Sequence, residues 1–370
     1  MYKAIEIKRN TTFVYQDELT SDPNHLMELP RKILIGNDVI YQLGSFIRDL
    51  NDKAAIVVVI SGNTVRARVG NECLQALDSS SLKHRWIETP NASMNDINSS
   101  QSIIEKEQPD FIIGLGGGRS VDVAKMISFN LNIPFISVPT SASHDGISSP
   151  FVSIRGRNKP YSLKAHAPIG VIADTRLISE APYRLQASGC GDLIGKITAV
   201  KDWELARDDK DEYFGSYAAN LANMSAKIII ENSNKLGDRV HIRTIVEALI
   251  SAGVASCIAG SSRPCSGSEH LFSHALEYVS NSNCGLHGER VGIGTIIMSK
   301  IHGLDHEIII KTLENIRAPT TAKEIDVAEE QIIKSLLIAQ SLRPERYTIL
   351  NKIKMDHDSA RAVAKSVSVI

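Results

Sequence analysis

The sequence predicts an α/β N-terminal domain with a parallel sheet, followed by an all-α C-terminal domain. Three observations lead to this fold class. The chain has 370 residues, and because single hydrophobic cores stop growing at roughly 250–300 residues, this length indicates two domains. Short apolar runs alternate with helical stretches as far as Asp174, which is typical of an α/β sheet. Beyond that residue the apolar positions recur with helical spacing, and strand-like runs nearly vanish.

The first half contains short runs of Ile, Val, Leu and Phe that are bounded by turn residues. Runs that are apolar throughout indicate strands buried on both faces, which is the pattern of a parallel sheet. The spacing between the runs leaves room for crossover helices. The predicted strands are Lys32–Ile35, Ala55–Ile60, Phe111–Leu115, Pro134–Val138 and Ile169–Ala173.

Long stretches with helical spacing follow one another after Asp174. Because no low-complexity linker separates the two halves, we expect packed domains over residues 1–176 and 177–370, with a ligand crevice at their junction. The predicted helices are Ala187–Ala206, Tyr213–Asn234, Val240–Ala259, Ser266–Ser280, Glu289–His302, Ala328–Ser341 and Asp356–Ser368.

Composition argues against several classes of protein. The 41 Lys and Arg residues are balanced by 42 Asp and Glu, so there is no basic excess to bind nucleic-acid phosphates. The longest weakly polar stretch, Val246–Gly260, falls short of the ~20 apolar residues of a membrane span. The N-terminus lacks a secretory signal pattern. Five dispersed cysteines without a CxxC pair indicate a reduced, cytoplasmic compartment.

A glycine-rich segment, Gly114–Asp122, follows the predicted strand Phe111–Leu115 and opens a helix. Backbone N–H groups at such a helix N-terminus bind anions, and glycine lets a phosphate approach closely. The spacing is neither the GxGxxG dinucleotide fingerprint nor a P-loop. The segment therefore predicts an anion site, and the alternative is a tight turn that only packs the helix on the sheet.

A polar loop, Pro139–Ser149, directly follows the neighbouring predicted strand Pro134–Val138. Open α/β sheets bind ligands at the carboxyl ends of their strands. The hydroxyl groups and Asp145 of this loop are suited to hydrogen bonds with a ribose and an amide. Taken alone, the loop is better explained as a set of capped polar turns.

Aspartate and histidine residues with metal-ligand spacing occur in the second half. His270 and His274 are four residues apart on one helix face, and His287 follows across a loop. The glycine-flanked Asp192 plus two histidines predict a metal site that keeps an open position, as in catalytic zinc sites. Each histidine singly is also explained as a buried, hydrogen-bonded imidazole, and Glu289 as a charge near a helix N-terminus.

These three constellations, in this order, resemble the superfamily of iron- or zinc-dependent polyol dehydrogenases, glycerol dehydrogenase and dehydroquinate synthase. Within it they are most similar to the sn-glycerol-1-phosphate dehydrogenase family. The similar segments spread over residues 114–350 and are GLGGGRSVDVAK, ISVPTSASHDGISSPFVSI, SGCGDLIGKITAVKDWELA, RPCSGSEHLFSHALE, LHGERVGIGT and RPERYTIL. The resemblance implies an N-terminal nucleotide-binding α/β domain, a helical C-terminal domain and an active site between them.

The resemblance also implies an activity, namely reduction of dihydroxyacetone phosphate to sn-glycerol 1-phosphate with NADPH or NADH, for the backbone of archaeal-type ether phospholipids. It implies one divalent metal ion, for which we expect zinc, held by Asp192, His270 and His287. Asp145, Asp192 and His274 match catalytic and substrate-binding positions. We further expect a homo-oligomer. The positions that match cofactor-binding residues are Gly116, Gly117, Gly118, Arg119, Ser120, Val121, Asp122, Thr140, Ser141, Ala142, Ser143 and Ser149.

One departure from the family pattern concerns the cofactor. NAD-preferring relatives carry an acidic residue just after the second strand, whereas Ser61-Gly62-Asn63 contains none. We therefore expect NADPH to be used at least as well as NADH, with Arg66 or Arg68 pairing with its 2′-phosphate. For the substrate phosphate the candidate donors are Arg155, Arg157, Lys159, Lys164 and His166.

Other functions remain as alternatives. A glycerol dehydrogenase acting on an uncharged triol would have no use for the basic stretch 155–166. A dehydroquinate-synthase-like phosphate lyase usually has Glu as its first metal ligand, where this chain has Asp192. A metal-dependent hydrolase would leave the glycine turn unexplained. A non-catalytic binding protein would leave the full set of metal residues unexplained.

Overall fold

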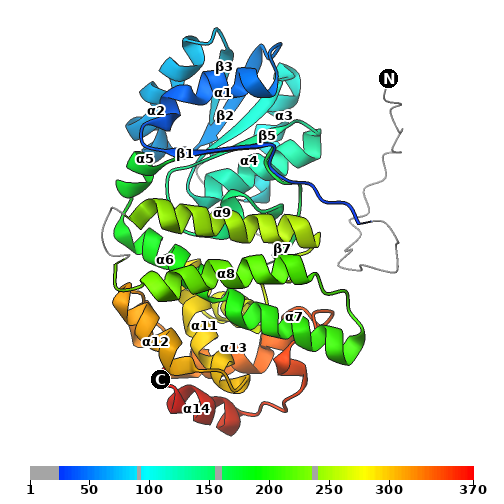
Figure 1. Cartoon of the computed structure of the whole chain (residues 1–370), viewed down its shortest axis with the longest axis vertical. Helices are drawn as coiled ribbons and strands as arrows, with labels where there is room; N and C mark the ends of the chain where they lie inside the picture. The colour runs from blue at the N-terminus through cyan, green and yellow to red at the C-terminus, as the bar shows by residue number, and fades with distance from the viewer. Residues whose placement is uncertain (1–24, 90–92, 155–160, 236–240) are drawn as a thin grey trace.

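The computed structural model describes residues 25–89, 93–154, 161–235 and 241–370 (Figure 1). One six-stranded sheet has the order β1-β8-β5-β4-β2-β3, and all of its neighbouring strands are parallel. The strands are β1 (Lys32–Gly36), β2 (Ile56–Ser61), β3 (Lys83–Glu88), β4 (Phe111–Gly116), β5 (Phe135–Pro139) and β8 (Gly170–Asp174). The parallel sheet predicted from the apolar runs is confirmed.

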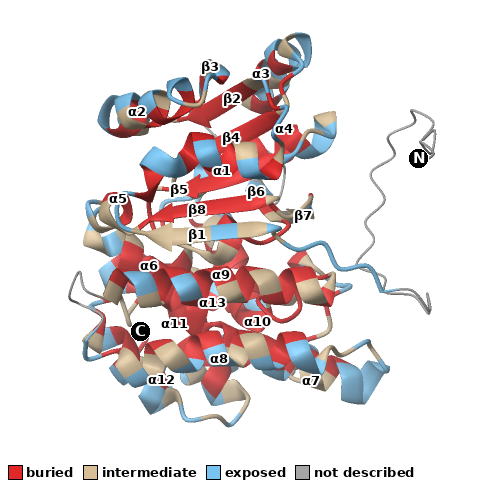
Figure 2. Ribbon diagram, turned by 45° about the horizontal axis from the view of Figure 1, so that its top comes forward, coloured by how far each residue is buried: buried red, intermediate tan, exposed pale blue. Residues whose placement is uncertain are grey.

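Helices cover both faces of this sheet. On β2, the side chains of Val57 and Val59 pack into one core with η1 (Val39–Gln42), α1 (Leu43–Leu50) and α2 (Asn63–Asp78). Those of Val58 and Ile60 pack into another core with α3 (Met94–Glu107) and α4 (Gly118–Leu131). Figure 2 shows the central strands as continuous buried bands. Burial on both sides explains why these strands are apolar at nearly every position.

The strand order reverses beside β2, which pairs with β3 on one side and with β4 on the other. β4 and β5 are neighbours, and their last residues, Gly116 and Pro139, lie opposite each other. The glycine turn after β4 and the polar loop after β5 therefore leave the sheet at the same edge. Ligands of open α/β sheets bind at this edge, next to the point where the strand order reverses.

Strand β3 and a small hairpin are absent from the sequence-based prediction. β3 lies at the edge of the sheet, and its KHRWIE sequence alternates exposed and less exposed side chains, so it lacks the continuous apolar run of a central strand. The hairpin pairs β6 (Phe151–Ile154) with β7 (Tyr161–Lys164) in antiparallel fashion. Its four-residue strands are too short for a periodic signal to stand out.

After Asp174 the described residues form helices and turns without strands, which confirms the all-α half. The prediction of one helix over Ala187–Ala206 is wrong, because Gly195 ends α6 and begins α7. The α-helices are α5 (Thr175–Ser179), α6 (Tyr183–Ile194), α7 (Lys196–Lys210), α8 (Ser216–Asn232), α9 (Ile242–Ala259), α10 (Ser268–Val279), α11 (His287–Ile301), α12 (His306–Asn315), α13 (Glu329–Leu342) and α14 (His357–Ser366).

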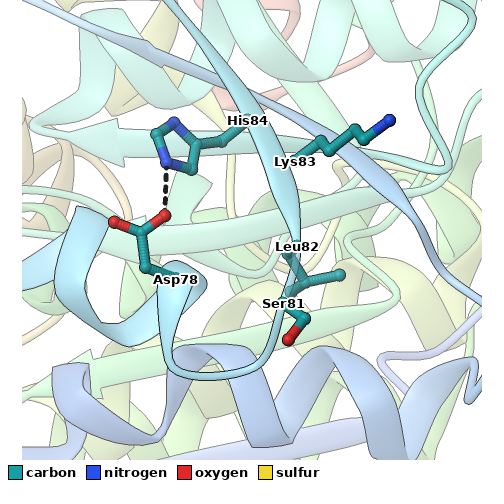
Figure 3. Close-up of a pocket in the computed structure, with 5 residues that line it drawn as sticks. All are labelled: Asp78, Ser81, Leu82, Lys83 and His84. Atoms are coloured by element: carbon teal, nitrogen blue, oxygen red, sulfur yellow. Dashed lines mark hydrogen bonds and ion pairs between the residues drawn. The ribbon is translucent and has the colours of Figure 1, made fainter.

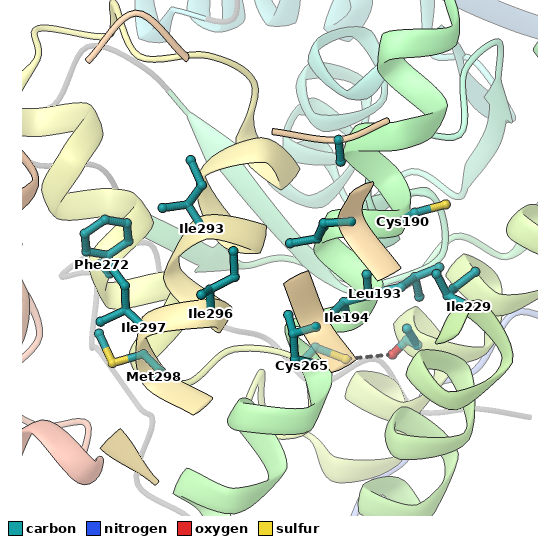
Figure 4. Packing of buried hydrophobic residues seen from close by; sticks show 14 of the residues in the cluster. Cys190, Leu193, Ile194, Ile229, Cys265, Phe272, Ile293, Ile296, Ile297 and Met298 are labelled. Carbon is teal, nitrogen blue, oxygen red and sulfur yellow. Dashed lines mark hydrogen bonds between the residues drawn. The ribbon is translucent and has the colours of Figure 1, made fainter. Parts of the chain in front are cut away.

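The largest apolar core joins the two halves. It contains Ala142 and Ile147 from the loop after β5 together with side chains from the helices, and Figure 4 shows its part around Cys190, Leu193 and Ile296. By length and composition alone α9 could cross a membrane, with a mean hydropathy of 1.6, yet 67% of it is buried within the fold. It is therefore explained as a core helix. The domain division at residues 176 and 177 stays a prediction, and α5 spans it.

Asp174 ties the end of β8 to two neighbouring segments. Its buried carboxylate accepts hydrogen bonds from the backbone N–H groups of Ile40 at 3.0 Å and Arg176 at 3.0 Å. It also accepts weaker ones from Asp38 and Leu177. Asp38 and Ile40 belong to the turn after β1 and to η1, and Arg176 and Leu177 belong to α5.

We predict that Asp174→Ala lowers the free energy of unfolding by about 2–4 kcal/mol, because a helix cap is lost and buried N–H groups are left unpaired. Denaturant unfolding of the two proteins measures the change. Asp52→Ala, an exposed site, is the matched control and should change stability by less than about 0.5 kcal/mol. Equal effects of the two substitutions would contradict the assigned role of Asp174.

Candidate active site

The turn between β4 and α4 has the backbone form of an anion site. Gly116 has a φ of +147°, and a Cβ there would lie 2.8 Å from Ser120 Oγ, so the position favours glycine. No side chain caps the helix N-terminus at Gly117. Its first backbone N–H groups therefore remain available for an anionic ligand.

The polar loop after β5 lies directly beside this turn. The Thr140 backbone N–H donates to the Gly116 carbonyl oxygen at 3.0 Å, and Ser141 Oγ lies 3.5 Å from Ser143 Oγ. Ser149 is buried, and its backbone N–H donates to the Asp145 carbonyl. The structure thus brings the two predicted cofactor segments together, while the cofactor role of each residue stays a prediction.

Three of the predicted cofactor residues have other contacts. The side chains of Val121 and Ala142 are buried in the apolar cores, so they offer only their backbones to a ligand. Asp122 is buried, and its Oδ2 accepts a hydrogen bond from the Ser153 N–H of the hairpin at 2.9 Å. Burial raises the pKa of this carboxyl group, although Lys125 opposes the shift.

Asp192, His270 and His287 converge from three different helices. Asp192 lies in α6, His270 in α10 and His287 at the first position of α11. Asp192 Oδ1 is 3.4 Å from His270 Nε2 and 3.8 Å from His287 Nε2, and the three ligand atoms all lie within 4.8 Å of one another. Neighbouring ligands of a tetrahedral zinc ion are about 3.3 Å apart. The residues therefore fit a single divalent ion with little movement.

Close contact between α6 and α11 makes this convergence possible. A Cβ at Gly191 would lie 2.3 Å from the Gly288 carbonyl oxygen, a distance at which any side chain would push the two helices apart. These glycines are sequence neighbours of Asp192 and His287. The GCGD and LHGE segments thus contain both candidate ligands and the small residues that let their helices approach.

Charged groups around Asp192 keep it ionised. Burial opposes the charge of this carboxyl group, but Lys196, His270 and His287 together lower its pKa well below the usual value. The Lys196 ammonium group donates to Asp192 Oδ1 at 2.9 Å. On the other carboxylate oxygen, the backbone N–H of Asp145 donates at 3.0 Å.

A buried carboxylate fixes the orientation of His270. Glu269 Oε1 lies 2.7 Å from His270 Nδ1, which leaves Nε2 directed at Asp192. Glu269 is held in turn by Thr198 Oγ1 and by the Gly267 N–H, each at 2.7 Å. This is the carboxylate–histidine arrangement that supports metal-binding imidazoles in many sites.

His274 lies next to the other two histidines, with its ring centroid 6.4 Å from that of His270 and 6.3 Å from that of His287. It is buried, and its Nδ1 has no hydrogen-bond partner among the described residues. Burial, and then the charges of His270 and three arginines, lower its pKa well below the usual value. His274 is therefore a neutral imidazole at neutral pH.

Lys196 and Glu269 are the site residues that the sequence analysis missed. Lys196 lies four residues after Asp192, and Glu269 directly precedes His270. Both spacings are visible in the sequence, but an Asp–Lys pair four apart is usually an ordinary helix ion pair. Only the fold shows that both side chains are fully buried and directed at the metal-site residues.

The basic residues predicted to bind the substrate phosphate either make other contacts or lie outside the described residues. Lys164 donates to the Gly260 carbonyl at 3.0 Å, and His166 Nε2 lies 2.6 Å from Ser128 Oγ. Arg155, Arg157 and Lys159 lie outside the described residues. Substrate-phosphate binding by this stretch stays a prediction.

Near the predicted 2′-phosphate site, Arg66 stacks over Trp86, with 5.6 Å between its guanidinium carbon and the ring centroid. It also forms an ion pair with Glu88. Glu88 ends β3 and pairs in register with Ser61. The edge strand therefore adds a carboxylate near Ser61-Gly62-Asn63, which that segment itself does not contain.

A surface hollow lies at the turn from α2 into β3 (Figure 3). Its residues are distant in sequence from Asp192, His270 and His287. It is lined by Asp78, Leu82 and His84 among others, and His84 Nε2 lies 2.9 Å from Asp78 Oδ1. None of the predicted site residues lines it. It contributes nothing to the candidate active site.

We predict that Glu269→Gln weakens zinc binding about 10- to 100-fold, because an amide cannot accept all the hydrogen bonds that orient His270. Competition with a chromophoric chelator measures the affinity. Thr198→Val removes one hydrogen bond to Glu269 without changing its charge and should have a clearly smaller effect. Unchanged zinc affinity in Glu269→Gln would contradict this role.

Comparisons with known proteins agree with the geometry. A family model described as iron-containing alcohol dehydrogenase matches residues 34–182. The chain is 51% identical to a glycerol-1-phosphate dehydrogenase (NAD(P)+) of Nitrosopumilus maritimus, over 96% of this chain and 99% of that relative. It is also 51% identical to one of Cenarchaeum symbiosum, over 94% and 98% of the two chains.

Solved structures show the same fold. A glycerol dehydrogenase from Schizosaccharomyces pombe has a TM-score of 0.76 at 19% identity and covers 93% of this chain and 90% of its own. A probable glycerol dehydrogenase from Sinorhizobium meliloti has a TM-score of 0.75 at 16% identity, over 93% and 98%. At these identities the likeness concerns the fold alone. Identity of about one half with the relatives above, over nearly the whole length, shows that the chain belongs to the glycerol-1-phosphate dehydrogenase family.

Proposed function

We propose that the protein interconverts dihydroxyacetone phosphate and sn-glycerol 1-phosphate with NADPH or NADH. The observation that carries the proposal is the hydrogen bond from the Asp145 backbone N–H to Asp192 Oδ2, at 3.0 Å. This bond joins the loop beside the glycine turn to the candidate metal site, as a dehydrogenase requires for cofactor and substrate to meet. The relatives named glycerol-1-phosphate dehydrogenase (NAD(P)+) support the choice of substrate.

The proposed metal ligands are Asp192 Oδ1, His270 Nε2 and His287 Nε2. A divalent ion bound there, for which we propose zinc, supplies Lewis-acid polarisation of the substrate carbonyl. Three protein ligands leave one coordination position open, which is the arrangement of catalytic sites. The protein would hold His270 and Asp192 in place through hydrogen bonds with Glu269, Lys196 and the Asp145 backbone.

The proposed cofactor site is the edge of the sheet at β4 and β5. There the N-terminal N–H groups of α4 would bind the pyrophosphate, and Thr140, Ser141 and Ser143 would meet the nicotinamide ribose. NAD(P)H supplies the hydride. Asp145 lies in the same loop, and its backbone N–H contacts Asp192, so the substrate would be held between the two halves of the protein.

We propose that His274 relays a proton and is itself a neutral imidazole between transfers. Its low pKa keeps the imidazole neutral, and a neutral imidazole has one nitrogen that donates and one that accepts. Its unpartnered Nδ1 is therefore suited to exchange a proton with the substrate or with a water molecule. Asp145, held by Lys196 at 2.7 Å, would orient the substrate hydroxyl group.

We further propose a cytoplasmic enzyme of ether-phospholipid synthesis, with domains over residues 1–176 and 177–370. A homo-oligomer is supported by apolar side chains on α8, where Tyr217 is 82% exposed and Met224 is 56% exposed. Large apolar side chains exposed on one helix are typical of interaction surfaces.

The proposed reaction is tested by adding dihydroxyacetone phosphate to the zinc-loaded protein with NADPH, whose absorbance should fall. Dihydroxyacetone should give a kcat/KM at least about ten- to a hundredfold lower, because the loss of even one phosphate hydrogen bond is worth roughly 1.5–3 kcal/mol. Dialysis against a chelator should abolish turnover, and zinc should restore it. Equal activity on both compounds would favour a glycerol dehydrogenase. Full metal content in an Asp192→Ala, His270→Ala double variant would contradict the ligand assignment.

We predict that NADPH is used at least as well as NADH and that Gly62→Asp shifts the preference towards NADH. Gly62 precedes α2, and a Cβ there would meet no atom within 4 Å, so the new carboxylate fits and repels a 2′-phosphate. The ratio of kcat/KM for the two cofactors measures the shift. Gly62→Asn adds the same bulk without charge and should leave the ratio nearly unchanged. A wild-type ratio strongly favouring NADH would show that this loop does not meet the ribose.

A further inference from the structure

Lys196 is a fully buried lysine whose ammonium group has three oxygen partners. Its Nζ lies 2.7 Å from Asp145 Oδ2, 2.9 Å from Asp192 Oδ1 and 3.3 Å from the Cys265 carbonyl oxygen. An ammonium group has three N–H donors, so these contacts use all of them. Lysine is almost never fully buried unless it is paired, which indicates that the pairing matters at this position.

The three partners come from three separate segments. Asp145 begins η2 (Asp145–Ile147) in the loop after β5, Asp192 lies in α6, and Cys265 precedes α10. The Asp145 backbone N–H also donates to Asp192 Oδ2. Asp145 is therefore attached to Asp192 twice, directly through its backbone and through Lys196 by its side chain.

The same contacts determine the charge beside the metal site. Asp145 and Asp192 with Lys196 between them carry one net negative charge, and without Lys196 they would carry two. The oxygen that accepts from Lys196, Asp192 Oδ1, is also the one that faces His270 and His287. Each additional negative charge at this distance strengthens the attraction for a cation and repels a phosphorylated substrate.

We propose that Lys196 is a positioning residue that holds the Asp145 carboxylate beside Asp192 and keeps the metal site one charge less negative. The inference rests on the proposed function, in which Asp192 holds a metal ion and Asp145 meets the substrate. A less negative site binds its ion less tightly. It leaves more of the positive charge of the ion to act on the substrate, and it tolerates the substrate phosphate.

The test compares the zinc affinity of four full-length proteins, stripped of metal and titrated with zinc against a chromophoric chelator. Lys196→Met should bind zinc at least about tenfold more tightly than the wild type. Asp145→Asn should bind it about tenfold more weakly, because the charge of Lys196 is then unbalanced. The double variant has the wild-type net charge and should return to within about threefold of the wild-type affinity.

Lys201→Met is the matched control, because it makes the same exchange on α7 at a half-exposed lysine that pairs with Glu204. It should leave zinc affinity unchanged. If Lys196→Met and the double variant both bind zinc more weakly, Lys196 serves only to maintain the structure and the proposal is overturned. If Lys196→Met does not fold, Asp145→Asn decides, and an unchanged or higher zinc affinity would overturn the proposal.

Kinetics with dihydroxyacetone phosphate provide a second readout. If Lys196 acts by holding Asp145, then Lys196→Met and Asp145→Asn should raise KM together, and their effects on kcat/KM should not add in the double variant. Fully additive effects would contradict the positioning role. A wild-type protein inactive with this substrate would overturn the proposed function instead, while the zinc titrations would still decide the charge of the site.

Discussion

Most of the active-site geometry depends on the buried carboxylate of Asp192. Both of its oxygens are in use, with Lys196 and two imidazoles around Oδ1 and the Asp145 backbone on Oδ2. A buried carboxylate is costly unless such partners surround it. The partners come from α7, α10, α11 and the loop after β5, so satisfying this one charge requires the two halves of the protein to meet in one arrangement.

Because its partners must come close to Asp192, glycine residues lie where the helices that carry them pack together. Gly191 lies against the Gly288 backbone, and this contact lets α6 and α11 approach closely enough to place His287 Nε2 at 3.8 Å from Asp192 Oδ1. Glu269 and Thr198 then fix the rotation of His270. The apolar core that contains Ala142 and Ile147 with the helices stabilises the same arrangement, so packing and polar contacts favour one structure.

The sequence predicts those parts of the fold whose local pattern matches their surroundings. The central strands are buried on both faces and appear as apolar runs, whereas β3 is an edge strand with an alternating pattern and was missed. The break at Gly195 was missed because apolar spacing continues across it. Among site residues, Asp192, His270 and His287 stand out because aspartate and histidine at such spacings are uncommon. Lys196 and Glu269 do not stand out, because their roles depend on their burial, which only the structure shows.

Several cationic side chains lie around the candidate active site, close to the imidazole of His274 and the carboxylate of Asp192. Burial, and then the charges of His270, Arg290, Arg343 and Arg346, lower the pKa of His274 well below its usual value, so these cationic groups favour its neutral form. A neutral imidazole can pass a proton to an oxygen that gains negative charge when its other nitrogen takes up a proton in exchange. The same environment favours a phosphorylated substrate over a neutral one. Lys196 lies beside the same oxygen of Asp192 that faces His270 and His287, so the helical half of the protein provides both the candidate metal ligands and the cationic groups near them.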